Sequence, residues 1–157
     1  MDKIPVIKDF MLKNVEVFHS DLSIIEAMKR LVTHDIPEAP VVENQEWGAK
    51  LIGIISEADC LKMIINDSFY GVHQDSHPVR DYMSTELITL GPDDHLSYAA
   101  DLFLQHRHRA IPVIDESGHL LGLVTRRMLL KESWFISKKN KAEKKAWLSP
   151  EMKAKLM

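Results

Sequence analysis

The sequence predicts a mixed α/β (α+β) fold: two β-α-β-β-α repeats packed sheet to sheet with pseudo-twofold symmetry, plus a C-terminal helical tail. The main observation is that the chain repeats itself. An offset of 72 residues superposes residues 7–11 on residues 79–83, and Pro40 on Pro112. After a three-residue gap, an offset of 69 superposes Leu51 on Leu120 and the residues that follow. Two copies of about sixty residues in so constant a register indicate a duplicated unit.

The second observation is the periodicity of apolar residues within each copy. Residues 15–18 and 87–90 are short runs rich in apolar and β-branched residues, which predict strands. An amphipathic helix should begin at Asp21 in the first copy and after residues 92–94 in the second, because apolar residues then recur at helical spacing.

Each copy then continues as a hairpin and a second helix. Pro37 and Pro40 end the first helix and lead into a strand at residues 41–42. A glycine-containing loop joins this strand to an apolar strand that begins at Leu51, as in a hairpin. Neither copy has enough elements to cover its own apolar face, so we expect the two to pack together.

These patterns divide the chain into four parts. Residues 4–66 form the first repeat, 67–78 a linker rich in turn formers, 79–137 the second repeat, and 138–157 a lysine-rich helical tail. The tail has seven Lys against two Glu, a charge of +5. Since the net charge of the chain is −3, residues 1–137 carry −8. An acidic body argues against a nucleic-acid-binding core, whereas the tail suits an acidic protein partner.

The tail contains a second helix signal at residues 149–151, where Ser, Pro and Glu follow one another. So short a helix is not stable alone. We therefore expect it either to fray as a solvated segment or to dock on the body, on a twin subunit or on a different protein.

The cellular location is indicated by the cysteine content and by the apolar segments of the sequence. The single cysteine, Cys60, cannot form an internal disulfide, which indicates a reducing compartment. Residues 1–5 show no signal-peptide pattern, and no apolar segment approaches the ~20 residues that span a bilayer. We expect a cytoplasmic protein with no membrane contact.

The junction from Ser56 to Asp59 is the strongest candidate site. An apolar strand ends at Ser56, which can cap the following helix, and Asp59 comes three residues later. The free N–H groups of the first helical turn suit an anion, and the carboxylate can accept hydrogen bonds from a diol. Phosphate and ribose are the ligand parts that this chemistry fits. The alternative is that Asp59 only stabilises its own helix, an effect worth ~0.3–1 kcal/mol.

The second copy alters this junction. Thr125 keeps the hydroxyl, but Met128 stands where the first copy has its carboxylate. Four arginines, at positions 107, 109, 126 and 127, lie near the equivalent junctions and suit a phosphate or carboxylate, since a guanidinium donates two parallel hydrogen bonds. The alternative is a set of surface ion pairs, each worth little.

Metal binding and catalysis find little support in the sequence. The pair His106 and His108 lacks the Cys or carboxylate partners of a zinc site, so we expect no metal. Cys60 has no recognisable His partner, and no phosphate-binding loop or nucleophile elbow occurs. We expect a protein that is not an enzyme.

The ordered motifs, present twice, resemble a tandem pair of CBS (cystathionine-β-synthase) domains, the Bateman module, over residues 4–137. The motifs are Asp-x-Met, a strand, a helix, Pro-Val-Val, a hairpin and Gly-Ile-Ile-Ser-x-x-Asp. The resemblance implies a regulatory module with two pseudo-symmetric sites in the cleft between the repeats. It implies no obligatory cofactor, and AMP, ADP, ATP or S-adenosylmethionine as a regulatory ligand.

Carried over by position, the resemblance gives Asp59 the ribose hydroxyls and places Ser56 near ribose or phosphate, while Met128 departs from the pattern. Together with two arginines suited to phosphate, the candidate ligand-binding residues are Asp59, Ser56, Val17, Ile36, Ala39 and Pro40 in the first copy, and Thr89, Ile111, Pro112, Thr125, Arg126 and Arg109 in the second.

The helices after both junctions are more apolar than a solvated surface requires, notably at residues 63–65 and 128–130. Such faces mark subunit contacts, and the resemblance also implies a homodimer. The alternative is that residues 134–136 of the same chain cover them. A different function stays open as well: a ligand-free module for dimerisation or protein interaction, or a tail that contacts nucleic acid or an anionic membrane.

Overall fold

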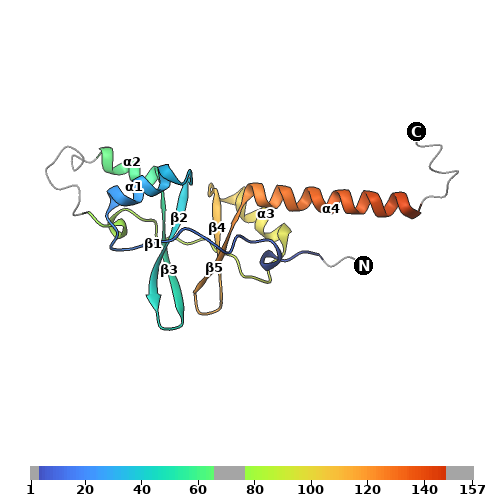
Figure 1. Ribbon diagram of the computed structural model, residues 1–157, viewed down its shortest axis with the longest axis horizontal. Helices are drawn as coiled ribbons and strands as arrows, with labels where there is room; N and C mark the ends of the chain where they lie inside the picture. The colour runs from blue at the N-terminus through green and yellow to red at the C-terminus, as the bar shows by residue number, and fades with distance from the viewer. Residues whose placement is uncertain (1–3, 66–76, 148–157) are drawn as a thin grey trace.

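The computed structural model describes residues 4–65 and 77–147 as two similar halves side by side (Figure 1). The first half contains β1 (Phe18–His19), α1 (Ile24–Thr33), β2 (Glu38–Gln45), β3 (Gly48–Ser56) and α2 (Glu57–Ile65). The second contains α3 (Leu96–Gln105), β4 (Ala110–Ile114), β5 (Leu120–Thr125) and α4 (Arg126–Trp147). Short 3-10 turns, η1 (Ile7–Asp9) and η4 (Val79–Asp81), precede the two halves. The predicted mixed fold, with its helix–hairpin–helix order in each copy, is confirmed.

The two sheets lie in the centre of the molecule with the helices on the outer sides (Figure 1). In the first, β1 pairs in parallel with β2, and β2 pairs antiparallel with β3. The second contains the antiparallel hairpin β4–β5. The hairpins meet where Lys50 bridges to His119, its equivalent in the second repeat.

The first strand of each repeat is shorter than predicted. Of residues 15–18 only Phe18 is in β1, and of residues 87–90 only Leu90 forms a bridge, to Val113. Both side chains are buried in the cores, at 0% and 1% exposure. Their apolar character therefore reflects burial at the point where the chain enters the sheet, rather than a long strand.

The first helix begins later than predicted. Helix α1 starts at Ile24, and the Ser23 hydroxyl accepts a hydrogen bond from the Glu26 N–H at 3.1 Å. The prediction of a start at Asp21 was wrong. The Leu22 carbonyl accepts the Val79 N–H at 2.8 Å, so it pairs with a distant segment instead of with the next turn of a helix.

That bond belongs to an exchange of segments between the halves. The segment after the linker packs on the first half, where the Ser84 N–H donates to the Ile54 carbonyl at 2.9 Å. The N-terminal segment packs on the second half in the same way, with Leu12 bridging to Leu123. These four residues are equivalent in pairs, so the exchange follows the pseudo-twofold symmetry. Each half is complete only with a segment from the other repeat.

Two equivalent glycines allow these crossings. A Cβ atom on Gly53 would lie 2.5 Å from the Met83 sulfur, and one on Gly122 would lie 2.7 Å from the Leu12 carbonyl oxygen. Any larger side chain would collide with the segment that crosses the sheet at that point.

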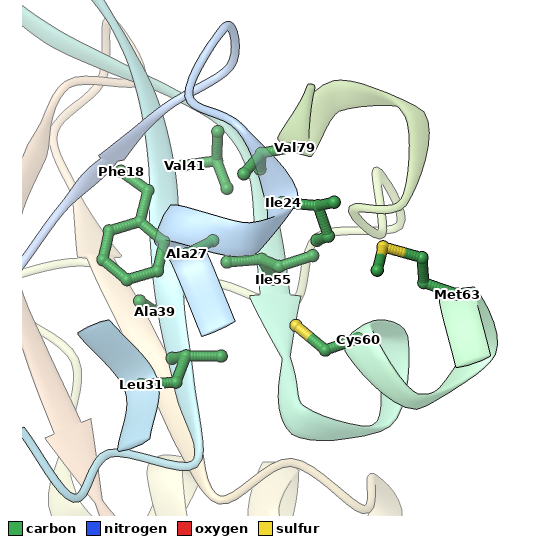
Figure 2. Packing of buried hydrophobic residues seen from close by; sticks show 10 residues of the cluster. All are labelled: Phe18, Ile24, Ala27, Leu31, Ala39, Val41, Ile55, Cys60, Met63 and Val79. Carbon is green, nitrogen blue, oxygen red and sulfur yellow. The ribbon is translucent and has the colours of Figure 1, made fainter. Parts of the chain in front are cut away.

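The cores show the same exchange. Figure 2 shows Val79, from beyond the linker, grouped with Ile24 of α1 and with Cys60 and Met63 of α2. The buried residues of the first core are Phe18, Ile24, Ala27, Leu31, Ala39, Val41, Ile55, Cys60, Met63 and Val79. Those of the second are Ile7, Leu90, Ala99, Leu102, Phe103, Ile111, Val113, Val124 and Leu129, in which Ile7 is the exchanged residue.

Helix α4 runs through the predicted start of the tail without a break. Its 22 residues reach from Arg126 to Trp147 and project beyond the second half (Figure 1). The predicted helix at residues 149–151 lies outside the described residues, as does the linker except for His77 and Pro78. Among the helices of residues 4–65 and 77–147, none has the length and apolarity needed to cross a membrane.

Candidate functional site

A cleft of about 340 Å³ lies between the two halves. One wall comes from the first half, where β2 begins, β3 ends and α2 starts. The other comes from the loop before β4, together with Ser84 of the exchanged segment. The lining residues are Pro37, Glu38, Ile54, Ser56, Glu57, Ala58, Asp59, Ser84, Arg107, His108 and Arg109.

Ser56 and Asp59 form a reciprocal cap at the start of α2. The Ser56 hydroxyl accepts the Asp59 N–H at 3.1 Å, while Asp59 Oδ2 accepts the Ser56 N–H and hydroxyl, each at 2.9 Å. The predicted cap is confirmed, and Asp59 therefore stabilises its own helix.

The cap leaves the second carboxylate oxygen of Asp59 for other partners. Oδ1 accepts a hydrogen bond from Lys62 Nζ at 3.2 Å, and the Lys62 side chain is largely exposed. Asp59 itself is only 7% exposed but lines the cleft. A ligand hydroxyl that replaced Lys62 at Oδ1 would break only an ion pair with an exposed lysine, which costs little. The capping role and a ligand role are therefore compatible.

The equivalent junction in the second repeat keeps only half of this arrangement. The Thr125 hydroxyl accepts the Met128 N–H at 3.2 Å, so the predicted cap is present. Met128 supplies no acceptor, and Arg126 and Arg127 at the start of α4 are exposed. The two junctions therefore differ in chemistry although they share their backbone.

Basic residues of the second half face Asp59 from across the cleft. Glu38 holds their loop: its Oε1 accepts the backbone N–H of Arg109 at 2.9 Å and of Ala110 at 2.6 Å. Its Oε2 lies 3.9 Å from His108 Nδ1. The Arg109 guanidinium lies 3.8 Å from the Glu57 carboxylate, so this ion pair also links the halves.

The structure brings together three of the predicted ligand residues, Asp59, Ser56 and Arg109, in one cleft. The others line different regions, and their ligand roles stay predictions. Ala39 and Ile111 lie in the two cores. Pro40 and Pro112 are buried within β2 and β4, Ile36 packs on the first core, Val17 and Thr89 are half-buried, and Thr125 and Arg126 lie at the second junction.

Several cleft residues were absent from the predicted ligand set, including Glu38, Glu57 and Ser84. Glu57 directly follows Ser56 and Glu38 directly precedes Ala39, so their positions in the motif could have indicated them. Ser84 gives no such signal, because it reaches the cleft only through the exchange of segments between the halves.

Cys60, beside the cleft, is not poised as a nucleophile. Burial raises the pKa of the thiol to about 11, and the negative charges of Asp59 and Glu57 add to the effect. The thiol therefore stays protonated and unreactive at neutral pH. Within the described part of the chain, no group of three or more His, Cys, Asp or Glu side chains is arranged to hold a metal ion.

Comparison with known proteins agrees with this architecture. The family model described as the CBS domain matches residues 7–66 and again residues 79–134. A homoserine O-acetyltransferase of Methanocorpusculum labreanum is 32% identical over 123 residues, which are 78% of this chain. The chain spans only 23% of that protein's length.

Two solved structures are similar over most of the chain. One is the Arabidopsis thaliana CBS-pair protein CBSX2 in complex with AMP, at 27% identity and a TM-score of 0.72, covering 84% of this chain and 98% of that one. The other is the CBS domain pair of protein MJ0100 with 5′-methylthioadenosine and S-adenosyl-L-methionine. It is 28% identical with a TM-score of 0.68, covering 87% of this chain and 99% of that one.

Proposed function

The chain belongs to the CBS-domain family and carries two such domains in tandem, and we propose that it is a regulatory module that senses an adenosine ligand. The ligand binds in the cleft beside Asp59, and its occupancy is passed on to a protein partner in the cytoplasm. CBS pairs of this kind are regulatory rather than catalytic, and the protonated Cys60 gives no reason to depart from that reading.

The observation that carries this proposal is the pairing of two chemistries across one cleft. Asp59 on the first half offers a carboxylate oxygen that suits the hydroxyls of a ribose. Arg107 and Arg109 on the second half suit a phosphate, because their guanidinium groups donate paired hydrogen bonds. The AMP bound by CBSX2 and the adenosine compounds bound by the MJ0100 pair support a ligand of this class.

A ligand held in this way would act on the orientation of the two halves. Its ribose would contact the first half and its phosphate the second, so it would favour the arrangement in which both contacts form. It can shift that equilibrium only by its difference in affinity for the two arrangements. The projecting helix α4 starts directly after β5 of the second half, and it is therefore the element best connected to carry the change to a partner.

Isothermal titration calorimetry of the full chain with AMP, ADP, ATP and S-adenosylmethionine tests the proposal. We expect saturable heat from at least one of them. The absence of heat from all four at millimolar concentration would overturn the proposal and leave the ligand-free alternative. A thermal shift gives an independent measure, since a ligand at 100 times its Kd adds about 2.7 kcal/mol to the free energy of unfolding.

A second function, dimerisation, is favoured by a repeated pattern of exposed apolar residues. Three positions on the helices of the first half, and the equivalent three on those of the second, carry apolar side chains that are each at least 54% exposed. The pairs are Val32 and Leu104, Leu61 and Leu130, and Ile65 and Trp134.

A surface that faces only water does not need apolar side chains at the same positions of both repeats. Such positions are typical of a surface that contacts another protein. Leu61, Ile65 and Leu130 are each at least 59% exposed, so residues 134–136 of the same chain leave them uncovered. We therefore propose a homodimer through these helices, compatible with ligand binding in the cleft. The molar mass from sedimentation equilibrium tests it, and a monomer at millimolar concentration would contradict it.

A further inference from the structure

The acidic residue Glu57 lines the cleft and is exposed to solvent. Its side chain is 61% exposed, and its carboxylate lies 3.8 Å from the Arg109 guanidinium, which is 62% exposed. Glu57 belongs to the first turn of α2, whereas Arg109 precedes β4 in the other half. A ligand phosphate that contacts the Arg109 guanidinium therefore also meets the Glu57 carboxylate.

The helix start does not by itself explain an acid at this position. Asp59 already supplies a carboxylate to the same turn of α2. The residue equivalent to Glu57 in the second repeat is Arg126, and the first turn of the longer helix α4 contains no acid at all. The negative charge therefore distinguishes the cleft from the second junction, where the corresponding charge is positive.

The charges around the cleft do not favour a highly anionic ligand. Three acids, Glu38, Glu57 and Asp59, stand against the two arginines and the Lys62 that pairs with Asp59, so with His108 neutral in the formal count the cationic groups are not in excess. A site for several phosphates would need an excess of cationic donors. The cleft volume of about 340 Å³ also lies near the lower end of the ~300–1,000 Å³ range of small-molecule sites.

Glu57 competes directly with a ligand phosphate. The guanidinium that it contacts is the group that the phosphate would use, so binding must break or share the ion pair. The exposed pair is weak enough to be displaced. The carboxylate nevertheless remains close to the bound phosphate, and its repulsion grows with each negative charge on the ligand.

We propose that Glu57 makes the cleft select adenosine ligands by their charge, favouring those with one phosphate or none over ADP and ATP. This inference rests on the proposed function, because it concerns the same cleft. It adds a specificity-determining residue and an ordering of ligands, neither of which follows from the binding of an adenosine compound alone.

The experiment compares the full-length protein with Glu57→Gln, which keeps the size and removes the charge. Glu46→Gln is the matched control: it removes one exposed acid from the β2–β3 turn, at the far end of the eight-residue strand β2, roughly 25 Å from the cleft at 3.3 Å per residue. Each protein is titrated calorimetrically with adenosine, AMP, ADP and ATP in metal-free buffer at low ionic strength.

We expect Glu57→Gln to tighten AMP binding about two- to fivefold, as the loss of one exposed charge allows. The gain should be larger for ADP and ATP, absent for adenosine and smaller at 0.5 M salt, because salt screens exposed charges. Glu46→Gln should leave all four affinities unchanged. Glu57→Lys should increase the same gains.

The outcomes separate this inference from the proposed function. Binding of AMP that Glu57→Gln leaves unchanged, or a gain equal for adenosine and ATP, would overturn the charge selection while the adenosine site stands. Wild-type protein that prefers ATP to AMP would overturn it too. If neither wild-type protein nor Glu57→Gln binds any of the four ligands, this inference fails. The proposed function fails with it only if S-adenosylmethionine gives no heat either.

Discussion

Glu38 and Ala110 occupy equivalent positions in the two repeats, and the Glu38 carboxylate accepts a hydrogen bond from the Ala110 N–H at 2.6 Å. The same oxygen accepts the Arg109 N–H at 2.9 Å. The Glu38 side chain is only 10% exposed and Ala110 only 5%, so the bond between them is largely shielded from water, whereas the bond to Arg109 is exposed. Alanine has no polar side chain, so Ala110 cannot make the reciprocal hydrogen bond to the backbone of Glu38. The two halves therefore differ at this pair of equivalent positions.

Replacing Glu38 with Ala should therefore destabilise the protein. The change leaves the Ala110 N–H, in a residue only 5% exposed, without its acceptor. We expect a loss of about 1–3 kcal/mol in the free energy of unfolding, the usual cost of an unsatisfied buried group. Urea unfolding measures it. Glu38→Gln keeps an acceptor oxygen and should lose less, and equal losses for both variants would contradict this explanation.

Asp59→Asn should weaken the binding of any adenosine ligand about 10- to 100-fold, because a hydrogen bond to a charged group contributes roughly 1.5–3 kcal/mol. Asparagine retains an oxygen that can accept the Ser56 N–H, so the helix start should survive. Calorimetric titration measures the change. The control is Met128→Leu at the equivalent position, which we expect to have no effect; similar losses in the two variants would mean that the ligand lies elsewhere.

Cys60 should make the stability depend on pH in the alkaline range. Its pKa in the folded protein is raised to about 11 from 9.0, so the folded state favours the protonated thiol. This contribution is fully present below pH 9 and is lost as the pH rises through 11. Wild-type protein should thus lose stability relative to Cys60→Ala between pH 9 and 11, by about 1 kcal/mol or more.

Urea unfolding of both proteins from pH 8 to 11 measures this difference, in which the titration of lysines and tyrosines common to the two proteins cancels. A difference that stays constant across the range would show that the thiol is not perturbed. Slow alkylation of Cys60 by iodoacetamide at pH 8 should accompany the result.

Leu61→Glu or Leu130→Glu should shift the protein towards the monomer. Each places a charge among the exposed apolar residues of the helices through which we propose that the dimer forms. Both side chains are largely exposed, so the fold of the monomer should be unaffected. Analytical ultracentrifugation measures the dissociation constant. Trp47→Glu is the matched control, since Trp47 is 82% exposed but lies on the β2–β3 turn, away from the helices. An equal effect of all three variants would argue against these helices as the interface.

Gly122→Ala should be more damaging than Gly53→Ala. The new Cβ on Gly122 would lie 2.7 Å from a backbone oxygen of Leu12, whereas that on Gly53 first meets the Met83 sulfur, which belongs to a flexible side chain. Overpacking of this kind costs about 1–3 kcal/mol. Gly91→Ala is the control, because its nearest neighbour would be 3.5 Å away. Equal thermal stability of the three variants would show that the segments around Leu12 and Met83 move aside at little cost in free energy.

Much of this protein was predictable from local sequence patterns. The duplication, the hairpin in each copy and the caps at Ser56 and Thr125 are all present, because they depend on neighbouring residues. Predictions failed where distant contacts override local preference. The strands at residues 15–18 and 87–90 are nearly lost, and the start of α1 moves from Asp21 to Ile24 because a distant segment uses the Leu22 carbonyl.

Which residues share the cleft depends on contacts between distant parts of the chain. Local sequence patterns place Asp59 at a helix start and Met128 at the equivalent position of the second repeat, and the binding of a ribose by Asp59 stays a prediction. Folding places Arg109 across the cleft from Asp59 and adds Ser84 from the exchanged segment. Glu38 then holds the backbone of Arg109 by a hydrogen bond. Periodicity records which face of an element is buried, but the partner of that face is chosen by packing between residues far apart in the chain.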